Sequence, residues 1–204
     1  MTTIKLHRND LPAGVEFRGA VAVDTETLGL QPRRDRLCMV QLSAGDGTAH
    51  LVQFDGTDWA APRLKAVLSD ASLTKIFHFA RFDVAVIAHY LGVVPEPLYC
   101  TKIASKLART YTDRHGLKDL CSELLGIELS KQQQSSDWAA EKLTEQQKVY
   151  AASDVLHLHA LEAKLSAMLR REGRSSLAED CFRFVSVRAG LDLAGFADVD
   201  IFSH

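Results

Sequence analysis

The 204-residue chain carries 24 Lys and Arg against 26 Asp and Glu, a formal net charge of −2, and 47% of its residues are hydrophobic. This balance is typical of one globular domain, and it excludes the broad basic surface with which proteins grip long nucleic acid. A nucleic-acid ligand would have to be short, or the basic groups would have to be concentrated at one mouth.

Targeting and membrane signals are absent from the sequence. Residues 1–12 contain no apolar run of the kind that a signal peptide needs, and no stretch approaches the length that crosses a bilayer. The cysteines, Cys38, Cys100, Cys121 and Cys181, match no zinc spacing and indicate reduced thiols. We therefore expect a cytoplasmic protein.

Three apolar runs predict the first strands, Ala20–Asp24, Leu37–Ser43 and Ala49–Phe54. The Gly- and Asp-rich turn at residues 44–47 joins the last two as a hairpin, so three antiparallel strands open the fold.

After these strands, predicted helices and strands alternate as far as residue 101, and the rest of the chain is mostly helical. A helix is predicted over 59–68, a strand over 73–79, a helix over 81–91 that stops at Gly92, and a short strand over 97–101. Further helices are predicted over 116–125, 145–171 and 176–189, with a polar connection over 127–138. This order predicts a single mixed α/β domain over 1–204, with its core at about 20–170 and a C-terminal helix and tail at 175–204.

Two acids end the first of these strands. Asp24 and Glu26 stand two residues apart, so in a strand both side chains point to the same face. Adjacent carboxylates beside a core are unfavourable unless a cation compensates them, and an all-oxygen ligand set favours Mg²⁺ or Mn²⁺. The alternative is a strand that runs out into a polar turn.

Two helices carry the other candidates. Asp83 lies in the first turn of a predicted helix, where the helix dipole alone would also favour an acid. Tyr150 and Asp154 stand four residues apart on one helix face, as a hydrogen-bonded pair or as part of a site. If the four acids converge, they could hold two divalent ions for an in-line phosphoryl displacement.

These residues lie in segments that resemble the three motifs of DEDDy-type 3′→5′ exonucleases: Asp24-Thr25-Glu26, the run from His78 to Asp83, and the run from Tyr150 to Val155. Residues 136–155 are similar to the ribonuclease D branch, and residues 24–32, 100–118 and 130–140 resemble the compact nanoRNase C group within it. The resemblance implies an RNase H-like fold flanked by helices, two divalent ions, short RNA 3′ ends as substrate, and a ring-shaped homo-oligomer such as an octamer.

The resemblance also implies roles for the motif residues. Asp24 would bridge both ions, Glu26 and Asp154 would bind the ion that activates water, and Asp83 would help to hold the ion at the leaving oxygen, in part through water. Tyr150 would hydrogen-bond the attacking water, a positioning role, because a tyrosine pKa near about 10 makes a poor general base.

Substrate contacts are implied for Thr27, Leu28, Leu30, His78, Phe82, Arg109, Arg114, His115 and Gln134. Leu30 matches a leucine that wedges between bases, although a leucine after a turn is as readily part of the core. Lys102, Lys106 and Arg109 share a predicted helix face and could contact phosphates, a neighbouring subunit or solvent. His78 could contact a phosphate or simply pack.

The leading hypothesis is a 3′→5′ exoribonuclease that hydrolyses short oligoribonucleotides, including dinucleotides, to 5′-mononucleotides. The alternatives are ribonuclease D-like trimming of structured RNA, exonuclease action on DNA, and an inactive RNA-binding scaffold, which the five intact motif residues disfavour. Fewer than 40 residues follow the third motif's helix, where larger ribonuclease D enzymes carry helical RNA-binding domains. Affinity would therefore come from oligomerisation, or a very short substrate would need little.

Overall fold

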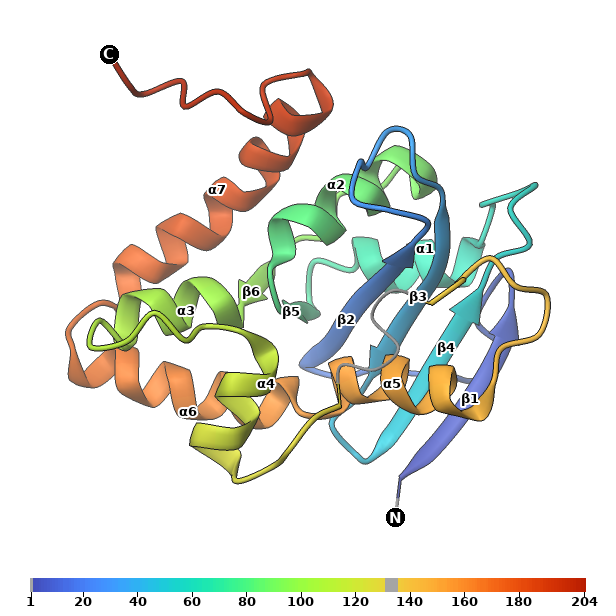
Figure 1. The fold of residues 1–204 in the computed structure, drawn as a ribbon, viewed down its shortest axis with the longest axis horizontal. Coiled ribbons are helices and arrows are strands. Elements are labelled where there is room, and N and C mark those ends of the chain that lie inside the picture. The colour runs from blue at the N-terminus through green and yellow to red at the C-terminus, as the bar shows by residue number, and fades with distance from the viewer. Residues whose placement is uncertain (1, 131–135) are drawn as a thin grey trace.

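A six-stranded mixed sheet flanked by helices organises the computed structural model, which describes residues 2–130 and 136–204 (Figure 1). The strands run in the order β1-β4-β3-β2-β5-β6. β2, β3 and β4 pair antiparallel, whereas β1, β5 and β6 each join the sheet in parallel. The predicted mixed α/β fold is confirmed. The strands are β1 (Thr3–Arg8), β2 (Ala20–Thr27), β3 (Leu37–Ser43), β4 (Thr48–Gln53), β5 (Thr74–Phe77) and β6 (Leu98–Cys100).

The edge strand β1 was not predicted from the sequence. It pairs with β4 in parallel, with Ile4 opposite Ala49 and Leu6 opposite Leu51. Its residues are exposed or half-buried, because an edge strand buries little of either face. It therefore lacks the apolar run that marks the inner strands, and only pairing with a distant segment defines it.

The helices fall into two groups. α5 packs against β1–β4, whereas α3, α6 and α7 gather beside β6 (Figure 1). α1 starts at Pro62 and not at Trp59 as predicted, because proline fits the first helical turn. The helices are α1 (Pro62–Ser69), α2 (Ala80–Leu91), α3 (Thr101–Ala108), α4 (Leu117–Leu120), α5 (Glu145–Leu156), α6 (Leu158–Arg171) and α7 (Ser175–Leu193), with a π-helical turn η1 (Cys121–Leu125) directly after α4.

The single long helix predicted over 145–171 is wrong. Its capping box is confirmed, since the Thr144 hydroxyl accepts from the backbone N–H of Gln147. However, the helix breaks at His157, whose φ and ψ are −107° and −4°. α5 packs on β2, β3 and β4, while α6 packs on α3 and η1. One straight helix cannot follow both surfaces, and the break lets the chain turn between them.

The helix predicted over 116–125 is also interrupted. Only Leu117–Leu120 is α-helical, and Cys121–Leu125 forms the π-helical turn η1, which ends at Gly126 with a positive φ of 69°. π-helical turns are rare and often lie near functional sites. η1 packs against α6.

The core is built from the inner strands and from the apolar face of α2. Val21, Val23 and Val40 are fully buried there, as are Val86 and Ile87. All cysteines are free thiols, and those at positions 38, 100 and 121 are buried. Within residues 2–130 and 136–204, no helix has the length and apolarity that crossing a membrane requires.

Candidate active site

The two acids of the first motif, Asp24 and Glu26, lie in the second half of β2. β2 lies between β3 and β5, and its pairing with β3 shifts register between Glu26 and Thr27. Asp24 and Glu26 are half-buried, and the two-residue repeat of a strand sends both side chains to one face. The strand therefore delivers two carboxylates to one point, as predicted.

Asp154 completes a group of three carboxylates. It comes from α5, and its ligand oxygen and those of Asp24 and Glu26 all lie within 4.8 Å of one another. α5 packs across β2 and β3, which brings residues 130 positions apart in the chain to one place. The predicted convergence of a strand end and a helix is thus seen for three of the four acids.

Asp83 stands beside this group and is linked to it through the strand. It lies in the first turn of α2 and is buried. Its Oδ1 accepts a 2.6 Å hydrogen bond from the hydroxyl of Thr25, the residue between the first two acids. Asp83 is therefore hydrogen-bonded to Thr25, whose side chain points to the face of β2 opposite to Asp24 and Glu26. One hydrogen bond thus links Asp83 to the strand that carries two of the three carboxylates.

The pKa of each of the four acids is raised, with burial as the largest cause. Burial raises the pKa of Asp24 to about 7. The pKa of Glu26 is well above its usual range through burial and through the charges of Asp24, Asp154 and Asp83. Burial and the charge of Asp24 likewise raise the pKa of Asp83 and that of Asp154. Burial and mutual repulsion thus oppose the ionisation of all four acids, and a bound cation would favour it.

This donor set fits a divalent cation. The ligand atoms of Asp24, Glu26 and Asp154 are all carboxylate oxygens, the type that Mg²⁺ and Mn²⁺ prefer. A bound cation would offset both the mutual repulsion and the burial of these carboxylates. Asp24, Glu26 and Asp154 would be the direct ligands, with Asp83 adjacent.

Tyr150 lies on the same helix as Asp154, one turn earlier. Its ring packs near the buried Trp138, with centroids 6.0 Å apart. Burial, followed by the charges of Asp154, Glu26 and Asp24, raises the pKa of Tyr150. The phenol stays protonated at neutral pH and can act as a hydrogen-bond donor or acceptor beside the acids.

Two residues near the acids were not singled out from the sequence. Thr25 binds Asp83, and the Gln41 amide on β3 lies 3.4 Å from Asp24 Oδ2, donating through Nε2. Gln41 is completely buried, and its Oε1 has no hydrogen-bond partner in the described part of the chain. A glutamine inside the apolar run of Leu37–Ser43 is the sequence signal that could have found it.

The loop after β2 presents apolar side chains to solvent. Leu30 is 86% exposed and Leu28 52% exposed, which excludes Leu30 from the core. A Cβ added at Gly29 would lie 2.2 Å from Asp35 Oδ2, and that same carboxylate oxygen accepts from the backbone N–H of Gln31. The loop is thus folded tightly around Asp35 and projects Leu30 outward.

The remaining predicted contacts near the motifs have different surroundings. Thr27, at the end of β2, donates to the backbone carbonyl of Gly29, and Phe82 is half-buried at the start of α2. His78 Nδ1 lies 2.9 Å from the Thr101 hydroxyl. Burial, with the charge of a nearby lysine, lowers the pKa of His78 to about 3, so at neutral pH the ring carries no positive charge for a phosphate.

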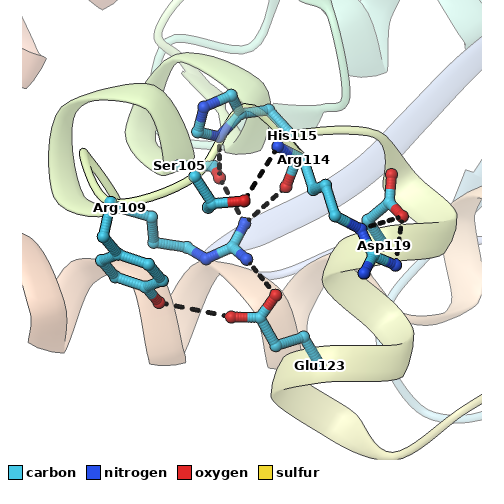
Figure 2. Close-up of polar contacts among 8 residues, drawn as sticks. Ser105, Arg109, Arg114, His115, Asp119 and Glu123 are labelled. Carbon is cyan, nitrogen blue, oxygen red and sulfur yellow. Dashed lines mark hydrogen bonds and ion pairs between the residues drawn. The ribbon is translucent and has the colours of Figure 1, made fainter.

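Arg109 lies in the interior rather than on a helix face. Its guanidinium donates 3.0 Å to Ser105 Oγ and 2.8 Å to the carbonyl of Arg114, and it forms an ion pair with Glu123 (Figure 2). Its side chain is 0% exposed. These contacts fold the segment between α3 and α4 around one buried cation.

The prediction that Arg109 shares a helix face with Lys102 and Lys106, from which all three could contact phosphates or a neighbouring subunit, is therefore wrong for Arg109. Arg109 follows the last residue of α3, and its side chain turns inward to contact Ser105 on α3, the Arg114 carbonyl and Glu123 on η1. Arg114 is exposed and pairs with an aspartate, and His115 Nδ1 lies 2.8 Å from a buried serine hydroxyl.

Lys102 lies over the ring of Phe79, with Nζ 4.2 Å from the ring centroid. Gln134, the last predicted substrate contact, is outside the described residues.

Known proteins with similar sequences identify the family of this chain. Residues 8–170 match the sequence profile of a family described as 3′-5′ exonuclease. The chain therefore belongs to the 3′→5′ exonuclease family, and its relatives place it in the ribonuclease D-like branch.

Two solved structures and one curated relative give the finer comparison. The chain is 59% identical to NrnC of Brucella melitensis bound to pGG, with a TM-score of 0.97 and full coverage of both chains. It is 58% identical to the same protein with bound Mg²⁺, with a TM-score of 0.95. It is 37% identical to ribonuclease D of Acidiphilium cryptum, over 76% of this chain but only 39% of that protein. These matches confirm the RNase H-like fold and the resemblance to compact ribonuclease D-like exonucleases.

Proposed function

We propose that this protein is a 3′→5′ exoribonuclease that hydrolyses short oligoribonucleotides, including dinucleotides, to 5′-mononucleotides by a two-metal-ion mechanism. The observation that carries the proposal is the group formed by Asp24, Glu26 and Asp154, whose ligand oxygens lie within 4.8 Å of one another. Such a group suits phosphodiester hydrolysis, because the reaction needs charge stabilisation and an oriented water more than covalent chemistry.

The acidic residues and Tyr150 have different proposed roles, according to where they lie in the site. Asp24, Glu26 and Asp154 would hold Mg²⁺ or Mn²⁺, which when bound stabilises the charge that develops on the phosphate oxygens. Asp83, held by Thr25, would support the side of the leaving oxygen, in part through water. Tyr150, protonated at neutral pH, would orient the attacking water through its hydroxyl.

The short substrate is supported by the surface and by the comparison. The chain carries a net charge of −2, which gives little attraction for long nucleic acid. Brucella NrnC was solved with pGG, and this chain matches it over its full length. Leu28 and Leu30 are exposed beside the first motif, where we place the contact with the terminal bases. Thr27 and Phe82 at the motif ends, and Arg114 and His115 between α3 and α4, complete the proposed substrate contacts.

A second candidate is ribonuclease D-like trimming of structured RNA 3′ ends. It is favoured by the 37% identity to a ribonuclease D, although the chain spans about two-fifths of that relative's length. Action on DNA 3′ ends is a third, less supported version of the same chemistry.

We also propose a cytoplasmic homo-oligomer built from one exonuclease domain over 1–204. The support for one domain is that α7 packs on α2, α3 and β6. The support for assembly is a row of exposed apolar side chains on α7 and the segment after it: Leu177, Phe184, Val187, Phe196, Val199, Ile201 and Phe202. Light scattering coupled to gel filtration would give the subunit number, and a monomer at micromolar concentration would contradict the assembly.

The test of function compares substrates and one site variant. The wild type should cleave pGG and other RNA dinucleotides faster than structured RNA or duplex DNA when Mg²⁺ or Mn²⁺ is present. Asp24→Ala should lose activity, whereas Glu179→Ala, which removes an exposed acid of α7, should not. Faster trimming of structured RNA would favour the second candidate. Equal activity of wild type and Asp24→Ala would show that this site is not catalytic.

A further inference from the structure

The C-terminal end of α7 is tied to the start of α2, two residues before Asp83. Arg81 donates to both oxygens of Asp192, from Nε at 2.6 Å and from Nη2 at 2.8 Å. Asp192 belongs to the last turn of α7 and its side chain is only 10% exposed. This is a two-pronged, charge-assisted pair, the geometry that fixes both partners most firmly.

The start of α2 needs such a tie. Phe79, the residue before the helix, has a φ of 71° and a ψ of 42°, a left-handed conformation that is unfavourable for a bulky residue. In the described part of the chain no side chain caps this helix start. Strained entries of this kind persist where surrounding contacts determine them, and the Arg81–Asp192 pair is an ionic contact at this helix start.

Asp192 is itself fixed from a second side. Arg188, one turn earlier on α7, lies 3.0 Å from Asp192 Oδ1. Arg188 also donates to the carbonyls of Phe196 and Ala197, at 3.0 Å and 2.7 Å. The carboxylate is thus held between two guanidinium groups, only one of which belongs to the active-site helix.

The same end of α7 reaches the loop that carries Leu30. Arg33 Nη1 donates to the carbonyl of Leu193 at 3.2 Å. The last turn of α7 therefore contacts both the helix of Asp83 and the loop after β2. This turn lies beyond residue 170, the last residue that matches the family's sequence profile.

We propose that Asp192 is a positioning residue for the metal site, acting through Arg81 to fix the start of α2 and thereby the carboxylate of Asp83. The proposal rests on the function proposed above. Asp83 must keep its place beside Asp24 while accepting the 2.6 Å hydrogen bond from Thr25. A small rotation of the first turn of α2 moves that carboxylate directly, because only two residues separate it from Arg81.

The experiment uses the full chain with three variants and two readouts. Asp192→Asn removes the charge and one acceptor, Arg81→Met removes the partner, and the double variant removes both. Arg183→Met is the matched control, since it removes another arginine of α7, one that pairs with the exposed Asp180, and leaves both arginine contacts of Asp192 in place. Mn²⁺ affinity is measured by calorimetry without substrate, and kcat and KM are measured with pGG. Thermal unfolding confirms that each variant is folded.

Asp192→Asn and Arg81→Met should each weaken Mn²⁺ binding about tenfold, the effect typical of losing an outer-shell partner. kcat should fall with little change in KM. The defect of the double variant should be smaller than the sum of the two single defects, because both substitutions remove the Arg81–Asp192 contact. Arg183→Met should retain wild-type Mn²⁺ affinity and kcat. If Asp192→Asn fails to fold, Arg81→Lys tests the same pair, because lysine cannot form the two-pronged contact.

Wild-type Mn²⁺ affinity and kcat in Asp192→Asn would overturn the proposal, as would an equal defect in Arg183→Met or additive defects in the double variant. The calorimetry separates this proposal from the proposed function. A wild type that binds Mn²⁺ but cleaves no oligonucleotide contradicts the function alone, while the dependence of metal affinity on Asp192 is still decided.

Discussion

Thr25 and Asp83 join the two sides of the metal site, because the Thr25 hydroxyl donates a 2.6 Å hydrogen bond to Asp83 Oδ1. Asp24 and Glu26 point to one face of β2, whereas Thr25 between them points to the other. A single strand end thus holds two acids directly and a third, from α2, through a hydroxyl. The position of Asp83 therefore depends on Thr25, the residue between the two acids of the first motif.

Thr25→Val should separate this role from packing. It removes the hydroxyl while keeping the shape, and it leaves the buried Asp83 oxygen without its donor. We expect the free energy of unfolding to fall by about 1–3 kcal/mol, measured by urea denaturation in chelator. We also expect weaker metal binding. Thr25→Ser, which keeps the hydroxyl, is the control, and equal defects in both variants would contradict the role of the hydrogen bond.

Tyr150→Phe should lower kcat by about 100-fold, the effect expected when a group that positions the nucleophile is lost. Metal affinity should be unchanged, because the phenol is not a ligand in this account. Single-turnover cleavage of a labelled dinucleotide measures the first quantity, and calorimetry with Mn²⁺ measures the second. A Tyr150→Phe variant that binds metal weakly would instead place the hydroxyl at the ion.

The stability of the metal-free protein should fall as the pH rises from 5 to 8. Burial raises the pKa of Asp24 to about 7 from its usual 3.8, so at pH 5 the folded protein holds a proton there that the unfolded chain has lost. This contribution is fully present below the unfolded pKa and is lost as the pH rises through the folded one. Thermal unfolding in chelator should show a smaller decrease for Asp24→Asn, and parallel pH profiles would contradict the assignment.

Leu30→Ala should raise the KM for a dinucleotide by about tenfold, because a leucine that buries itself against a base contributes roughly 1.5–3 kcal/mol. Stability should hardly change, since the side chain is 86% exposed. Val94, another exposed aliphatic residue at 49%, gives the control variant Val94→Ala. An unchanged KM would remove Leu30 from the substrate site.

Arg109→Lys should destabilise the fold without weakening substrate binding. Lysine cannot reach Ser105, the Arg114 carbonyl and Glu123 together, and we expect a loss of about 2 kcal/mol, typical of hydrogen bonds to a charged group. Steady-state kinetics well below the unfolding temperature should give a wild-type KM. A raised KM in a fully stable variant would return Arg109 to the substrate site.

The sequence predicted the site well where geometry is local. Asp24 and Glu26 share a face because strands repeat every two residues, and Tyr150 and Asp154 share one because four residues make about one helical turn. Their meeting required only that α5 cross the end of β2. The hairpin of β3 and β4 was equally predictable, since its turn residues are adjacent in the chain.

The features that the sequence did not predict share a physical cause: each depends on contacts with residues that are distant in the chain. Arg109 looks like a surface cation until Glu123 and the Arg114 carbonyl fold around it. The break at His157 follows from the two surfaces that α5 and α6 cover, and no residue near it marks the break in the sequence. β1 exists only through its pairing with β4.

The capping box of α5 has a consequence for how this chain can change in length. Thr144 fixes where the helix begins, and Tyr150 and Asp154 are then set by rotation along it. Deleting one residue between them and the cap would turn both side chains by about 100°, away from Asp24 and Glu26. Insertions and deletions in the ten residues from Glu145 to Asp154 would therefore misdirect both side chains, even where the helix itself still forms.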